Sequence, residues 1–137
     1  MKKICILLSI ILCIVFFSGC SYTGNVKNVE IITTESEFFT EEEIRDAIEV
    51  VKAKFVGFTG CTLTKIGYIG DEKMLDYLPN EAPDNPSYIV LDCEFKTSFT
   101  STSVGFNANE TYEYGWWKWY LIKDDLGNWI IENYGVA

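Results

Sequence analysis

One segment of this chain has the pattern of a helix with a defined start and a single apolar face. Thr40 and Glu43 have the spacing of a capping box, in which each side chain accepts a hydrogen bond from the other residue's backbone N–H. The apolar residues that follow at helical spacing are Ile44, Ala47, Ile48, Val51, Phe55 and Phe58. Gly57 and Gly60 favour an end of the helix there. An amphipathic helix must bury its apolar stripe against a second layer, which limits the chain to a few architectures.

The second layer is predicted by segments with the two-residue period of β-strands. These segments are residues 61–69, 87–99, 111–123 and 129–136, with a further short strand at residues 29–33. Asp71 is expected to cap a short helix, and Gly127 suits the turn between the last two strands. We therefore predict an α+β fold in which one long N-terminal helix packs on a curved antiparallel sheet of about four strands.

The start of the chain has the pattern of an exported lipoprotein. A positively charged beginning precedes an apolar run at residues 4–17, which is too short for a membrane span of about 20 residues and suits a signal peptide. The run ends in two small residues before Cys20, an arrangement that resembles the lipobox read by lipoprotein signal peptidase. We predict cleavage before Cys20 and acylation of that cysteine. The alternatives are an ordinary secretory signal and an uncleaved anchor.

This prediction sets the domain organisation: residues 1–19 as lipoprotein signal peptide, 20–38 as lipidated tether and 39–137 as a single α+β globular domain. The expected partner is the cell membrane, contacted through the lipid on Cys20 at its extracytoplasmic face. The net charge is −9 and becomes two units more negative once residues 1–19 are removed with their two lysines. An acidic protein is a poor partner for nucleic acid, and lipid rather than charge must hold it at the membrane. An envelope protein or a small ligand stays a candidate partner.

Residue usage excludes several kinds of chemistry. The sequence has no histidine, which removes histidine-dependent triads and histidine-ligated zinc. The cysteines after Cys20 are Cys61 and Cys93, and they form no Cys-X-X-Cys motif. We expect no metal and no cofactor. Cys61 and Cys93 could form a disulfide outside the cytoplasm. Alternatively, Cys93 takes a core-facing position of its strand and packs as a small apolar side chain.

Three motifs together resemble a known family. They are residues 39–44 (Phe-Thr-Glu-Glu-Glu-Ile), residues 60–63 (Gly-Cys-Thr-Leu), and residues 117–124 (Trp-Lys-Trp-Tyr-Leu-Ile-Lys-Asp) running into Gly-Asn-Trp at 127–129. This combination resembles small Gram-positive lipoproteins and secreted domains of unestablished function, with cystatin-like cone folds related to nuclear transport factor two. The resemblance covers most of residues 29–137, implies a fold and supplies no catalytic residues. The family often closes with Trp-Gly-Tyr, where this chain has Tyr-Gly-Val at 134–136.

The aromatic strand at residues 111–123 carries the candidate ligand-binding residues. They are Tyr112, Tyr114, Trp116 and Tyr120 in one strand parity, and Trp117 and Trp119 in the other. One face of the strand must pack on the helix, and the other could present rings to a sugar, a peptide or a partner strand. Alternatively, Trp117, Trp119 and Trp129 fill the core while the tyrosines cover the outer face of the sheet.

We expect a non-enzymatic module that binds a small ligand or another envelope protein. The alternative is a small cone-fold enzyme, as the resemblance includes enzymes that transfer a proton with an Asp and a Tyr. Asp92 with Tyr68 or Tyr120 could imitate that pair, although Asp92 lies opposite the apolar residues of its strand and is expected to be solvated. A third possibility is an interaction module that uses a sheet edge or the loop at residues 100–110.

Overall fold

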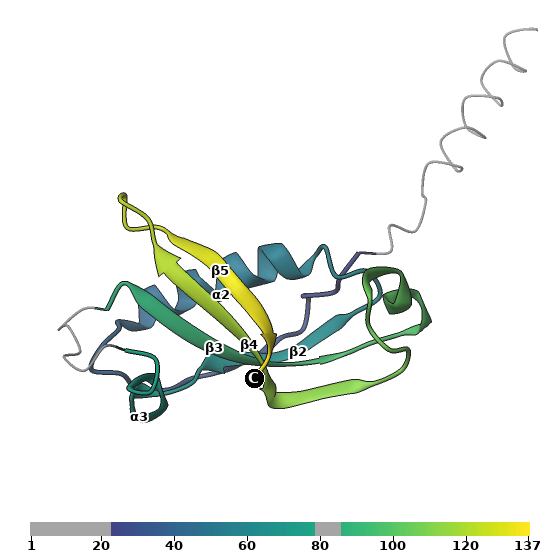
Figure 1. Ribbon diagram of the computed structural model, residues 1–137, viewed down its shortest axis with the longest axis horizontal. Coiled ribbons are helices and arrows are strands. Elements are labelled where there is room, and N and C mark those ends of the chain that lie inside the picture. Colours follow the sequence, from purple (N-terminus) through teal and green to yellow (C-terminus); the bar gives the residue numbers. More distant parts are fainter. Residues whose placement is uncertain (1–22, 79–85) are drawn as a thin grey trace, which may run out of the picture.

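A five-stranded sheet forms one layer of the molecule, and the computed structural model describes residues 23–78 and 86–137 (Figure 1). The strands, in both chain and spatial order, are β1 (Glu30–Ile32), β2 (Thr62–Tyr68), β3 (Tyr88–Lys96), β4 (Thr111–Lys123) and β5 (Trp129–Val136). β1 runs parallel to β2, and the other neighbours are antiparallel. The predicted α+β class is confirmed. The predicted count of about four strands is too low, because the short β1 adds to the edge of the sheet.

The helix α2 (Glu41–Phe55) lies across one face of the sheet. Its capping box is present, since the Glu43 N–H donates to Thr40 Oγ1 at 3.2 Å and the Thr40 N–H donates to Glu43 Oε2 at 2.8 Å. Its buried residues are those of the predicted stripe: Ile44, Ala47, Ile48, Val51 and Phe55. The prediction of a long N-terminal helix is wrong. The helix has 15 residues, follows β1 and stops at Phe55, after which the chain turns towards Gly60 with a φ of 73°.

Two short helices complete the connections, α3 (Asp71–Met74) and the 3₁₀ helix η1 (Phe99–Val104). Asp71 is the first residue of α3 and not its cap. Its carboxylate instead accepts hydrogen bonds from the Ser36 hydroxyl and from the Glu37 N–H, both at 2.6 Å. These bonds fasten the segment before α2 to the end of β2. η1 occupies part of the segment predicted as a loop.

The chain enters the fold at the C-terminal end of α2. The Gly24 N–H donates to the Val56 carbonyl oxygen and the Asn25 N–H donates to that of Cys61, both at 2.8 Å. Together with β1, these bonds place residues 23–38 on the body of the domain, which therefore begins earlier than the predicted boundary at residue 39. The predicted signal peptide and Cys20 lie outside the described residues. Within those residues, no helix is long and apolar enough to cross a membrane.

An irregularity in β4 changes which face its first residues occupy. In the pairing of β3 with β4, Cys93 lies opposite Trp117 and Phe95 lies opposite Tyr112. One residue of β3 is thus matched by four residues of β4, and Gly115 among them has a φ of 95°. Such a bulge breaks the alternation of faces along a strand. Tyr112 consequently shares the helix-facing side of the sheet with Trp117.

Candidate functional site

A cavity of about 520 Å³ lies beside the C-terminal end of α2, between η1 and the ends of β4 and β5. Its wall consists of Lys54, Gly57, Phe58, Val104, Gly105, Phe106, Tyr112, Trp117, Tyr134 and Val136. Half of these residues are aromatic and one is charged. A cavity of this volume and composition is within the range of small-molecule sites, which are mostly apolar with a few polar groups.

The aromatic wall is assembled from distant parts of the sequence. Phe58 follows the end of α2, Phe106 follows η1, and Tyr134 comes from β5. Their rings converge on Trp117, whose ring centroid lies 6.4 Å from that of Phe58, 5.5 Å from that of Phe106 and 6.1 Å from that of Tyr134. The Tyr112 ring lies 6.0 Å from Trp117 and perpendicular to it. These separations are typical of favourable aromatic pairs.

Trp117 carries an unusual polar group in this apolar wall. The residue is 9% exposed, and its Nε1–H is the only buried side-chain N or O atom of the described residues without a hydrogen-bond partner. The other two buried indoles are paired. Trp119 Nε1 donates to Cys93 Sγ at 3.2 Å, and Trp129 Nε1 donates to the Glu43 carbonyl oxygen at 3.0 Å. A buried donor without an acceptor costs about 1–3 kcal/mol, so this indole lowers the stability of the fold relative to a paired one.

Lys54 supplies the only positive charge in the wall of this cavity. Its Nζ lies 6.0 Å from the centroid of the Tyr134 ring, at the outer limit of a cation–π interaction. An ammonium group beside an apolar cavity favours a ligand with an anionic end.

The predicted aromatic residues do not form one site. Tyr112 and Trp117 line the cavity, while Trp119 is fully buried and its ring stacks on Phe58 at 5.6 Å. Trp116 is 64% exposed and lies outside the cavity. Sequence reasoning missed Phe58 as a cavity residue because it continued the helical stripe. Phe106 and Tyr134 had no distinguishing pattern, although Gly115 inside a strand was an available signal of the bulge.

Two predicted tyrosines lie on the face of the sheet turned away from α2. Tyr120 lies between Tyr77 and Tyr88, with ring centroids 6.0 Å and 6.5 Å away. Burial, and after it the charge of Asp92, raises the pKa of Tyr114 to about 12. Burial also raises the pKa of Tyr88 to about 12. These phenols are therefore neutral packing groups at ordinary pH.

The expectation that Asp92 is solvated is wrong, because the side chain is 2% exposed. Its Oδ1 accepts a hydrogen bond of 2.6 Å from Lys118 Nζ, which also donates to the Gly115 carbonyl oxygen at 3.0 Å. Asp92 does lie on the face of β3 opposite its apolar residues, as predicted, but the β4 bulge brings Tyr114 over that face. The Tyr114 hydroxyl lies so close above Gly67, the neighbour of Asp92 on β2, that a Cβ there would be 2.9 Å from it.

The structure does not join Asp92 to either tyrosine proposed for proton transfer. The Tyr68 hydroxyl donates to Asp71 Oδ1 at 2.9 Å, and Tyr68 itself packs under α2 against Phe39 at 5.3 Å. In the described part of the chain, the Asp92 carboxylate is hydrogen-bonded to Lys118 and to no tyrosine. Asp92 also lies outside the aromatic cavity.

Cys61 and Cys93 are both free and buried, so of the two alternatives the disulfide is absent and Cys93 packs as a small apolar side chain. Cys93 lies opposite Ile66, which is five residues beyond Cys61 and so about 16 Å further along the chain. The Cys61 thiol instead contacts Ser101 Oγ at 3.5 Å. Burial raises the pKa of Cys93 to about 12 and also raises that of Cys61, so neither thiol is an activated nucleophile.

No group of three or more cysteine or carboxylate side chains within residues 23–78 and 86–137 is placed to hold a metal ion. None of the protein-family models, curated proteins or solved structures compared with this chain matches it. The aromatic cavity is therefore interpreted from its own geometry.

Proposed function

We propose that this chain is a membrane-anchored extracytoplasmic lipoprotein whose domain binds a small, mostly apolar ligand in the aromatic cavity. The anchor is the lipid on Cys20 after removal of residues 1–19. A helix laid on a mostly antiparallel sheet is compatible with a cystatin-like cone related to nuclear transport factor two. The observation that supports binding most directly is the cavity of about 520 Å³, half of whose lining residues are aromatic.

The cavity chemistry suggests the class of ligand. Flat apolar groups stack well on aromatic rings, so the body of the ligand is a ring or an unsaturated group. An anionic end would be attracted to Lys54 at the edge of the cavity. The proposed ligand is therefore a small cyclic or unsaturated acid.

The enzyme alternative has less support. A proton-transfer carboxylate needs a tyrosine or a substrate within hydrogen-bond reach, at about 2.6–3.2 Å. The Asp92 carboxylate has a lysine in that place, and the residue is not part of the cavity wall. Ligand binding without chemistry is the function that this geometry supports best.

Fluorescence titration of the domain without its lipid tests the proposal. The probe is anilinonaphthalene sulfonate, an apolar ring system with an anionic group. Val104→Trp places a large side chain in the cavity wall, whereas Leu126→Trp is the matched control, because Leu126 is 86% exposed in the β4–β5 turn. We expect saturable one-to-one binding that Val104→Trp weakens about tenfold or more, equivalent to about 1.4 kcal/mol, and that Leu126→Trp leaves unchanged. Equal affinity in both variants would overturn the assignment of the cavity.

A further inference from the structure

The distance between the lipid anchor and the folded body is short. Thr23 is the first described residue, and the next residue, Gly24, is already hydrogen-bonded to Val56 just beyond α2. A Cβ at Gly24 would clash with the Phe55 carbonyl oxygen, which shows how closely the entering chain packs there. The three residue steps from Cys20 to Thr23 span at most about 10 Å. A lipid on Cys20 therefore holds the C-terminal end of α2 close to the membrane surface.

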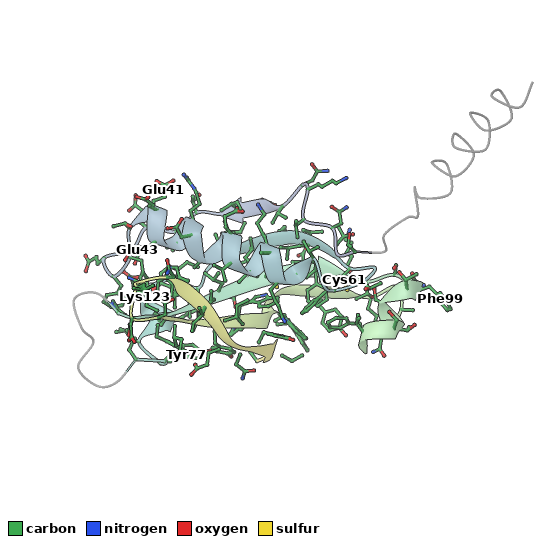
Figure 2. All side chains as sticks on the ribbon, turned by 90° about the horizontal axis from the view of Figure 1, so that it is seen from above. Glu41, Glu43, Cys61, Tyr77, Phe99 and Lys123 are labelled. Carbon is green, nitrogen blue, oxygen red and sulfur yellow. The ribbon has the colours of Figure 1, made fainter. Side chains whose placement is uncertain are left out.

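η1 lies at this same end of the molecule. The Ser101 hydroxyl contacts the Cys61 thiol at 3.5 Å. The backbone carbonyl oxygen of Cys61 accepts the hydrogen bond from the Asn25 N–H of the entering chain. Figure 1 shows η1 and the first described residues at one end, opposite α3 and the β4–β5 turn. In Figure 2, Phe99 projects from the tip of this end, away from the sheet.

The tip is uncharged and exposes two apolar side chains among hydroxyl residues. Phe99 is 77% exposed, and Val104 in the same short helix is 42% exposed. Residues 99–109 contain no charged side chain, and the first acidic residues after them are Glu110 and Glu113. An exposed aromatic ring in an uncharged segment is suited to the interface of a lipid bilayer.

The distribution of charged residues along the molecule also favours the η1 end as the end that faces a membrane. The far end carries the acidic first turn of α2 at residues 41–43, the Asp124–Asp125 turn and the Asp71–Glu72 pair. Trp129, at the start of β5, directly follows the Asp124–Asp125 turn. Its Nε1 donates a hydrogen bond to the Glu43 carbonyl oxygen, which holds this turn near the start of α2. The last turn of α2, near the entering chain, carries Lys52 and Lys54. An anionic lipid surface would repel the acidic end and leave the η1 end in contact.

We propose that the η1 tip inserts Phe99 into the lipid interface of the anchoring membrane, so that the domain stands on it with its acidic end outward. This inference rests on the lipidation of Cys20 in the proposed function. The cavity shares Val104 and Gly105 with this end, so it would lie in the membrane-proximal part of the domain.

Site-specific fluorescence quenching tests the orientation. The purified lipoprotein is reconstituted into vesicles of phosphatidylcholine and phosphatidylglycerol that contain a shallow acyl-chain nitroxide. The fluorophore nitrobenzoxadiazole is attached to Phe99→Cys or, as the matched control, to Leu126→Cys. Cys61 and Cys93 are buried, and the thiol of Cys20 is consumed by the lipid, so labelling is selective. We expect quenching at position 99 to be about threefold or more stronger than at position 126.

A second variant is the control for membrane insertion that is caused by the fluorophore and not by Phe99. With the label on Val104→Cys, the added change Phe99→Asp should lower the quenching about threefold, and because Phe99 is exposed the fold should persist. Equal quenching at positions 99 and 126 in lipidated protein would overturn this inference alone. So would concentration-dependent self-quenching at position 99, which would identify a second copy as the partner. An intact mass without lipid on Cys20 would overturn the proposed anchor and this inference with it.

Discussion

Replacing Trp117 with Phe removes an indole N–H that has no acceptor among the described residues. A buried unpaired donor costs about 1–3 kcal/mol, so its removal offsets the packing that the smaller ring gives up, which is on the order of 1–2 kcal/mol. We therefore expect the free energy of unfolding of Trp117→Phe to stay within about 1 kcal/mol of the wild type. Urea denaturation followed by far-ultraviolet circular dichroism measures this difference.

Trp119→Phe is the matched control, because it removes the same atoms from a fully buried indole whose Nε1 donates to Cys93 Sγ. It loses both packing and a hydrogen bond, and we expect a cost of about 2–3 kcal/mol. We expect the two variants to have the opposite order of effects on ligand affinity. Trp117→Phe should weaken binding of anilinonaphthalene sulfonate about fivefold, whereas Trp119→Phe should change it little. Equal destabilisation by the two variants would refute the reasoning, since it would mean that the Trp117 N–H has an acceptor.

Three further predictions concern charged groups. Asp92→Asn should lower the free energy of unfolding by about 3 kcal/mol, because it leaves the Lys118 ammonium, 13% exposed, without its counter-ion; a loss below about 1 kcal/mol in urea denaturation would contradict this. Burial raises the pKa of Asp71, but hydrogen bonds from Ser36 and the Glu37 N–H lower it more, so its pKa in the folded state is below the usual 3.8. The contribution of the Asp71 carboxylate to the free energy of unfolding is therefore fully present above pH 3.8 and is lost as the pH falls through the lower folded value. Asp71→Asn should make the melting temperature depend less on pH between pH 5 and pH 2, and a pH profile equal to that of the wild type would disprove this. Lys54→Gln should weaken the binding of anilinonaphthalene sulfonate about threefold in the titration and leave the free energy of unfolding unchanged. An affinity equal to that of the wild type would show that Lys54 does not contribute to binding.

The local elements of this fold were predictable because their signals are local. The capping box of Thr40 and Glu43 involves residues three apart, and the stripe of α2 follows from helical periodicity alone. One of the two alternatives also interpreted Trp117, Trp119 and Trp129 correctly as buried residues. These features depend on neighbours in the sequence and on the two simple periods of regular structure.

The candidate site was not predictable in the same way, because it depends on how the strands pair. Counting alternate residues placed Tyr112 and Trp117 on opposite faces, and the four-residue bulge at Gly115 returns them to one face. The same bulge covers Asp92, which strand parity alone placed in solvent. Phe106 joins the wall only because the chain folds back after η1, and this depends on long-range packing.

Native mass spectrometry of the lipoprotein purified from its own membrane tests the central claim most directly. The account predicts a chain that begins at an acylated Cys20 and carries one small molecule, which the Val104→Trp variant purified in parallel lacks. A chain that retains residues 1–19, or a bound molecule that is equally abundant on both proteins, would contradict it.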